Sequence, residues 1–97
     1  MTPDRCALCG RDRPLTFHHL VPKKVHSRRR VKLRFDREEL QRGIHLCRPC
    51  HRAVHHFVPH LELAERYHTL DALREHPDIA RFVAWASKQD RGKGYVR

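Results

Sequence analysis

Residues 47–57 read CRPCHRAVHHF, and this short stretch holds both a cysteine pair and a histidine pair. Cys47 and Cys50 form a CxxC knuckle, a spacing that lets two thiolates bind the same ion. A second knuckle, Cys6 and Cys9, lies near the N-terminus. Two knuckles complete a tetrahedral four-cysteine zinc site, which is normally closed and structural. Four buried free cysteines are the alternative, but two such spacings seldom arise by accident.

A helix is predicted over the same stretch, from about Pro49 to Phe57 or Val58. His51 and His55 are four residues apart, so they share one face of this helix and can bind one metal ion. The alternative is that both are polar residues of a solvated helix face. Apolar residues that recur at helical spacing and should face the core are Val54, Phe57, Val58 and Leu61.

A second histidine pair lies in residues 15–21, LTFHHLV, whose β-branched and aromatic residues are typical of a strand. Residues 44–46, IHL, predict a short second strand that leads into the CRPC knuckle. Neighbouring side chains of a strand point to opposite faces. We therefore expect His18 and His19 to have different roles.

The remaining predicted elements are short helices. Residues 36–43, DREELQRG, predict a helical turn with Asp36 as its N-cap and Gly43 as its stop. Thr69 is a plausible N-cap for a helix in residues 69–76. The other predicted helices are residues 60–68 and residues 77–89, the last with an apolar stripe of Ile79, Phe82, Val83 and Ala86. A β-containing first half followed by a helical second half predicts an α+β fold.

The chain has 97 residues, four cysteines, ten histidines and a formal charge of +10. A chain this short forms one small domain, which bound metal often helps to stabilise. We expect this domain to cover residues 1–89, with a motif core at about 6–58 and a helical extension at about 59–89. Residues 90–97 are expected to be a basic, flexible tail.

The chain contains no apolar run long enough to span a membrane, and its N-terminus lacks the apolar core of a signal peptide. We therefore expect a cytoplasmic protein without membrane contact. In that reducing compartment, closely spaced cysteines are metal ligands more often than disulfides.

Residues 22–34, PKKVHSRRRVKLR, are strongly basic and include no acidic residue. Such a loop can hold nucleic acid, because lysine and arginine contacts to phosphates position the backbone without reading bases. The alternative is a solvated charge run, but a place beside the histidine pair favours phosphate binding. The candidate phosphate contacts are Lys23, Lys24, Arg28, Arg29, Arg30, Lys32 and Arg34.

The combined pattern resembles the HNH endonucleases of the ββα-metal class, in the subclass braced by a four-cysteine zinc. The motifs that carry the resemblance are CALC, FHHL, IHLC and CRPCHRAVH, which span about residues 6–56. The resemblance implies that His18 binds a catalytic metal and that His19 is the general base that activates water. It also implies that His51 and His55 are the helix ligands of that metal.

The resemblance implies a metal-dependent phosphodiesterase that acts on DNA, most naturally double-stranded, with RNA as the alternative substrate. Its products would carry 5′-phosphate and 3′-hydroxyl ends. Imidazole ligands favour Zn²⁺, Ni²⁺, Co²⁺ or Mn²⁺. Mg²⁺ is a further candidate for the catalytic ion, as in relatives that have a carboxylate in the first position. A monomer and a homodimer are both compatible with the sequence.

The chain departs from the family pattern at one position, because it contains no asparagine. The family asparagine lies nine residues before the helix histidine, where this chain has Arg42. Gln41 and His45 are the candidates to replace it. A non-catalytic, zinc-braced module that binds DNA or RNA through a degenerate site is therefore the alternative function, with metal storage or sensing as a third. The histidines treated as surface or structural residues are His26, His60, His68 and His76.

Overall fold

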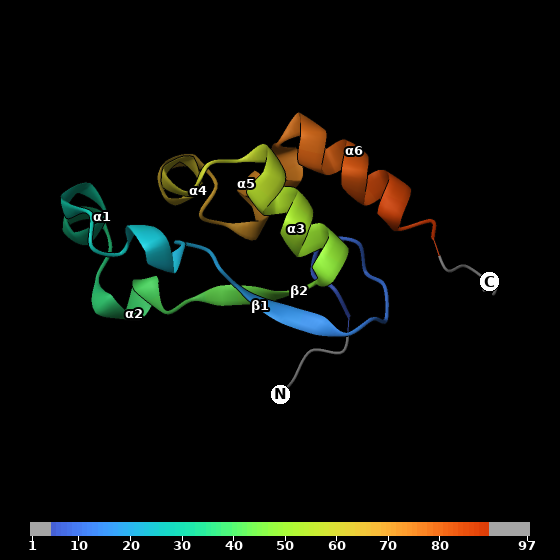
Figure 1. Ribbon diagram of the computed structural model, residues 1–97, viewed down its shortest axis with the longest axis horizontal. Helices are drawn as coiled ribbons and strands as arrows, with labels where there is room; N and C mark the ends of the chain where they lie inside the picture. The colour runs from blue at the N-terminus through green and yellow to red at the C-terminus, as the bar shows by residue number, and fades with distance from the viewer. Residues whose placement is uncertain (1–4, 90–97) are drawn as a thin grey trace.

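The computed structural model describes residues 5–89 and forms a small α+β fold, as predicted (Figure 1). The expected tail at residues 90–97 lies outside the described residues. The elements are β1 (Leu15–His19), η1 (Lys23–Val25), α1 (Arg29–Arg34), α2 (Arg37–Leu40), β2 (Gly43–Cys47), α3 (Arg48–Phe57), α4 (His60–Arg66), α5 (Leu70–Glu75) and α6 (Pro77–Ala86). None of the helices within this range combines the length and apolar character needed to cross a bilayer.

The two strands form an antiparallel hairpin in which His18 lies opposite Ile44 and His19 lies opposite Gly43. Gly43 was predicted to stop the preceding helix, and this is wrong, since α2 has Gln41 as its C-cap and Gly43 begins β2. A side chain at Gly43 would collide with the His18 carbonyl and the Phe17 ring. Glycine is therefore needed here for the close approach of the two strands.

Helices α3, α5 and α6 lie on one face of the hairpin (Figure 1). The main core joins these elements and α4 to the cysteine loop, and its fully buried side chains include Leu46, Val54, Leu63, Leu73 and Ile79. The predicted core stripe of α3 is confirmed for Val54 and Val58, which are buried, whereas Phe57 is only partly buried. Burial of this stripe fixes how α3 rotates on the hairpin and hence where its polar face points.

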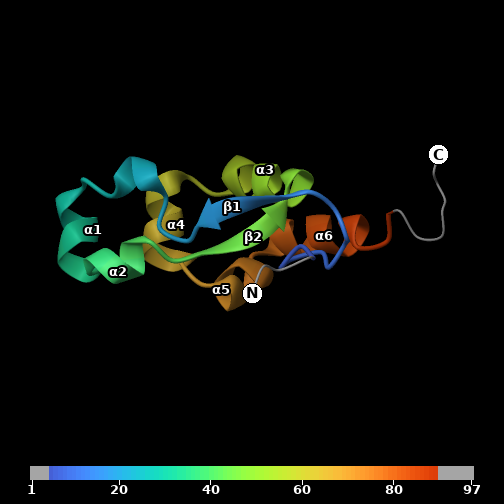
Figure 2. The same ribbon diagram turned by 90° about the horizontal axis from the view of Figure 1, so that it is seen from below.

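The basic segment between the strands was expected to be a phosphate-binding loop, with a solvated loop as the alternative. In the structure it contains η1 and α1, and these lie with α2, the predicted helical turn, beyond one end of the hairpin (Figure 2). Its apolar residues form a second core in which Val21, Val25, Val31 and Phe35 pack with Ala64 of α4. These apolar positions are few and widely spaced among basic residues. The basic sequence therefore shows no helical pattern of apolar residues, and α1 forms because tertiary packing stabilises it.

Side-chain caps define three of the helix starts. Asp36 and Glu39 form a capping box at α2, and Thr69 accepts a hydrogen bond from the Ala72 amide at α5, as predicted. At α6, the Nδ1 atom of His76 accepts from the Asp78 amide at 3.2 Å. His76 is thus a structural residue, in agreement with the sequence-based interpretation.

Candidate metal centres

The four cysteines converge at the junction between β2 and α3. Their Sγ atoms all lie within 4.8 Å of one another, and all four residues are buried. Cys47 ends β2 and Cys50 lies in the first turn of α3, whereas Cys6 and Cys9 come from the N-terminal loop. Gly10, at a φ of 76°, turns this loop back so that its amide donates to the Cys6 carbonyl at 2.9 Å.

The electrostatics of this cysteine cluster fit a bound cation. A hydrogen bond with Cys50 lowers the pKa of Cys6 to about 4, whereas the same contact raises the pKa of Cys50. Buried thiolates this close repel one another, so all four can ionise together only with a compensating positive charge. Arg11 supplies part of it, since its Nε donates to Cys9 Sγ at 3.3 Å. A tetrahedral Zn²⁺ ion, which binds thiolate ligands well, would supply the remaining positive charge.

Three histidines form a second cluster beneath α3. His18 of β1 and His51 and His55 of α3 offer ring nitrogens within 4.8 Å of one another. Their ring centroids are 4.9–5.2 Å apart. A strand and a helix far apart in the sequence thus combine into one potential set of metal ligands.

His18 is the feature of this cluster that most requires a partner. It is fully buried, and neither ring nitrogen has a hydrogen-bond partner among the described residues. A buried polar group left unsatisfied costs about 1–3 kcal/mol. A divalent ion between the three imidazoles would satisfy one of these nitrogens, so the residues present fit a metal.

The protonation states also suit metal binding, which requires neutral imidazoles. Burial, together with the nearby His51, His55 and His19, lowers the pKa of His18 to about 3. Burial likewise lowers the pKa of His55 to about 4, and it lowers the pKa of His51. At neutral pH the cluster therefore presents free lone pairs rather than positive charges.

Thr16 fixes the orientation of one of these rings. Its hydroxyl donates to the Leu46 carbonyl at 3.0 Å and lies 2.8 Å from His51 Nδ1. Because the hydroxyl hydrogen is committed to the carbonyl, the hydroxyl oxygen accepts from Nδ1–H. This leaves the lone pair on His51 Nε2, the nitrogen available to a metal. Thr16 was not predicted from the sequence, although a threonine two residues before His18 lies on the same strand face.

His19 differs from its neighbour in environment, as the strand alternation predicts. It is only partly buried and lies beside the Phe17 ring at 4.9 Å and the His26 ring at 6.0 Å. Partial burial lowers the pKa of His19, and the positive charges of Lys23 and His26 add to this effect. His19 is therefore a neutral, accessible imidazole at neutral pH.

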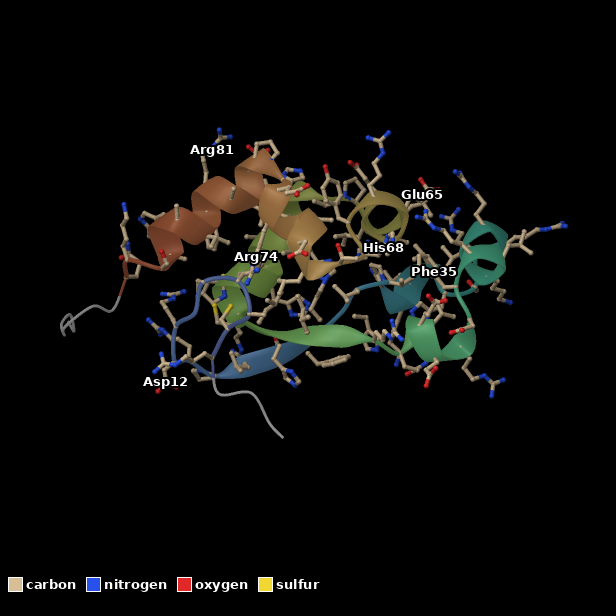
Figure 3. The ribbon with its side chains drawn as sticks, turned by 180° about the vertical axis from the view of Figure 1, so that it is seen from behind. Asp12, Phe35, Glu65, His68, Arg74 and Arg81 are labelled. Atoms are coloured by element: carbon tan, nitrogen blue, oxygen red, sulfur yellow. The ribbon has the colours of Figure 1, made fainter. Side chains whose placement is uncertain are left out.

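Of the histidines treated as surface or structural residues, His60 lies beside the histidine cluster and His26 lies beside His19. The His60 ring is 5.1 Å from that of His55. His26 donates from Nε2 to the Val21 carbonyl at 2.6 Å, which fixes its ring next to His19. His68, by contrast, packs on Phe35 at the far end of the molecule (Figure 3).

The two candidates for the missing asparagine occupy different places. Gln41 is exposed at the end of α2, and the carbonyl of neighbouring Arg42 accepts from the Leu20 amide at 3.1 Å. His45 lies opposite Phe17 in the hairpin, with ring centroids 5.4 Å apart. His45 therefore shares the strand face of His19, whereas Gln41 does not lie in the hairpin.

The basic stretch divides into two parts. The charge of Lys23 lowers the pKa of His19 and the charge of Lys24 lowers that of His55, so each lysine lies near one of these imidazoles. On α1, Arg30 forms an ion pair with Glu65 of α4 at 2.6 Å, and Arg34 donates to the Glu65 carbonyl at 3.0 Å. The other basic side chains on or beside α1, Arg28, Arg29 and Lys32, are exposed.

An open hollow of about 250 Å³ lies over the histidine cluster and is lined by Thr16, Arg48, His51, Arg52 and His55. Arg48 and Arg52 add positive charge on the open side of the imidazoles. Neither arginine was predicted from the sequence. The signal for them is their helical spacing with His51 and His55, which places all four on adjoining faces of α3.

Comparison with known proteins gives one informative relative. No family model matches the chain, and no solved structure matches it. The chain is 39% identical over 85 residues to the uncharacterized protein YisB of Bacillus subtilis (strain 168). The aligned region covers 87% of this chain and 74% of YisB. At this identity and coverage, the protein belongs to the same family as YisB.

Proposed function

We propose that this protein is a metal-dependent HNH-type endonuclease that hydrolyses DNA phosphodiester bonds. The observation that carries the proposal is the buried His18, whose two ring nitrogens have no partner while its ring adjoins those of His51 and His55. A purely structural core position would hold an apolar residue at lower cost. An imidazole at this position has a clear use as a metal ligand.

His19 acts as the general base in this proposal. Its pKa is lowered, so it is neutral at physiological pH and takes a proton from water. The water oxygen then attacks phosphorus, and the 3′ oxygen leaves. A divalent ion held by His18, His51 and His55 would stabilise negative charge on the phosphate and the leaving oxygen. Lys23, Lys24, Arg48 and Arg52 hold the substrate phosphates.

The cysteine cluster has a structural role in this proposal. It ties the N-terminal loop to the point where β2 becomes α3, and Arg74 of α5 donates to the Ala7 carbonyl within that loop at 3.2 Å (Figure 3). A zinc ion bound there would fix the angle between hairpin and helix. That angle determines whether His18 meets His51 and His55.

A nucleic-acid-binding module without activity is the competing function. It is favoured by the missing asparagine, since Arg42 stands at the family position, where its backbone bonds Leu20 and Glu39. Such a module needs lysine and arginine for phosphate contact, but it has no use for three clustered neutral imidazoles.

A plasmid-nicking assay with Mg²⁺, Mn²⁺, Co²⁺, Ni²⁺ or Zn²⁺ separates the two functions. We expect the wild type to nick supercoiled DNA, and His19→Ala to lose roughly 10²–10⁴-fold in rate while it still binds metal. His18→Ala should bind metal more weakly, and added metal should partly restore its cleavage. Glu38→Gln, at an exposed position of α2, is the control. No nicking with any ion, together with intact DNA binding, would establish the binding module instead.

A further inference from the structure

We propose that the apolar groove between α3 and α6 binds an unpaired DNA base next to the phosphate at the histidine cluster. This inference rests on the proposed function and specifies its substrate as DNA that is single-stranded or locally unpaired. Nothing in the hydrolytic chemistry requires this groove, so it is an additional binding site.

The groove has the dimensions and lining of a ligand site. It measures about 340 Å³, within the range of roughly 300–1,000 Å³ typical of small-molecule pockets. Its lining residues are Pro49, Arg52, Ala53, His56, Phe57, Phe82 and Trp85. Trp85 is 57% exposed, and its ring centroid lies 5.6 Å from that of Phe82. An exposed tryptophan that borders an apolar groove of this size indicates a binding surface.

Arg52 connects the groove to the candidate active site. Its side chain lines both the groove and the hollow that contains His51 and His55. The two sites therefore adjoin on neighbouring faces of α3. A strand whose phosphate lies over the imidazoles can place a nearby base in the groove, with Arg52 between the two.

The chemistry of the groove favours a base over other occupants. Aromatic rings combined with arginine form stacking platforms for single-stranded nucleic acid, because every base has a π-face. Bases in a duplex are already stacked on their neighbours, so the site selects an unpaired one. A second copy of this chain is disfavoured, since each copy carries a formal charge of +10 and the copies repel each other.

The sole tryptophan of the chain provides a direct readout. A short single-stranded DNA is titrated into the full-length, zinc-loaded protein without added second metal, and Trp85 emission is followed. An oligonucleotide with the same phosphates but abasic residues is the matched ligand. We expect quenching by the normal oligonucleotide alone, and binding that is roughly five- to a hundred-fold tighter than that of the abasic one.

Variants test whether Trp85 is responsible. In fluorescence anisotropy with labelled DNA, Trp85→Ala should abolish the preference for intact bases, and Trp85→Phe should retain part of it. Leu33→Ala, which removes a 77% exposed apolar residue from α1, should leave the preference unchanged. Circular dichroism checks that α6 is intact in each variant.

Several outcomes would overturn the assignment. Equal binding of intact and abasic DNA with constant emission would mean that bases do not enter the groove. Emission that changes with protein concentration alone would indicate a second copy there, and tighter binding of a matched RNA would exclude DNA as the preferred occupant. Base preference without plasmid nicking would reject the nuclease proposal while supporting the groove.

Discussion

At the scale of single residues, the hydroxyl of Thr16 determines which nitrogen of His51 is free. We expect Thr16→Val, which keeps the side-chain shape and removes the hydroxyl, to weaken binding of the second metal by roughly 10–100-fold. Thr16→Ser should retain most of the affinity, because it keeps the bond to Nδ1. Calorimetric titration of metal into the zinc-loaded protein measures this difference.

A second readout distinguishes orientation from simple destabilisation. Nitrogen chemical shifts of His51 should report the Nδ1–H tautomer in the wild type and in Thr16→Ser, and a mixture of tautomers in Thr16→Val. Equal metal affinity and an unchanged tautomer in Thr16→Val would remove Thr16 from the candidate site.

The buried imidazole of His18 predicts a specific loss of stability in acid. Its pKa is about 3 in the folded protein and about 6.5 when unfolded, so below pH 6.5 only the unfolded chain gains the proton. Stability is therefore full above pH 6.5 and falls as the pH decreases toward 3. Between pH 7.5 and pH 5 this single group should cost about 2 kcal/mol.

Urea unfolding of the wild type and His18→Phe at these two pH values measures the effect. The phenylalanine variant lacks the titrating group, so its stability should decrease by about 2 kcal/mol less than that of the wild type over the same interval. Both proteins contain the cysteine cluster, so its effect on the pH dependence of stability is the same in each and cancels in the comparison. Parallel losses in the two proteins would show that His18 does not remain neutral in the folded state.

At the scale of elements, the junction between β2 and α3 depends on the cysteine cluster. Cys47→Ser should release zinc and unfold much of the domain, since structural zinc contributes on the order of 10 kcal/mol, comparable to the whole stability of a small domain. Metal analysis and thermal melting test this directly. Unchanged zinc content and an unchanged melting curve would contradict a structural zinc at this junction.

Exposed basic side chains on and beside helix α1 do not contribute to its packing against the core. Replacing Arg28 and Arg29 by glutamine should reduce the slope of log affinity against log salt by up to about 1.8 if both contact phosphates of duplex DNA. The fold should persist, because the apolar contacts of Val31 and the ion pair of Arg30 with Glu65 remain. Salt titrations of DNA binding measure the slope, and an unchanged value would identify a merely solvated helix.

At the scale of the whole molecule, the candidate site forms where separate parts of the chain meet. The histidine cluster needs β1 and α3, and the cysteine cluster needs the N-terminal loop and the β2–α3 junction. Both clusters lie along α3, so the position of one helix on the hairpin controls both. Helices α5 and α6 cover the remaining apolar surface of this core, and α6 forms the outer wall of the Trp85 groove.

Local sequence patterns alone determined the secondary structure of most of this protein. The CxxC spacings, the period of Val54 and Val58 and the cap at Thr69 each depend on residues within a few positions of one another. Such local signals can be read from the sequence without knowledge of the tertiary structure. They predicted the α+β order, the cysteine cluster and the shared helix face of His51 and His55.

Only the tertiary structure decided what depends on contacts between distant segments. The complete burial of His18, the hydrogen bond from His51 to Thr16, the hollow with Arg48 and Arg52 and the groove at Trp85 each require two elements to meet. Helix α1 was not predicted for the same reason, because its buried Val31 packs in a core that includes Ala64 of α4. Packing stabilises a helix only when a second element lies against it. The residue pattern of one segment therefore does not predict which contacts it will make.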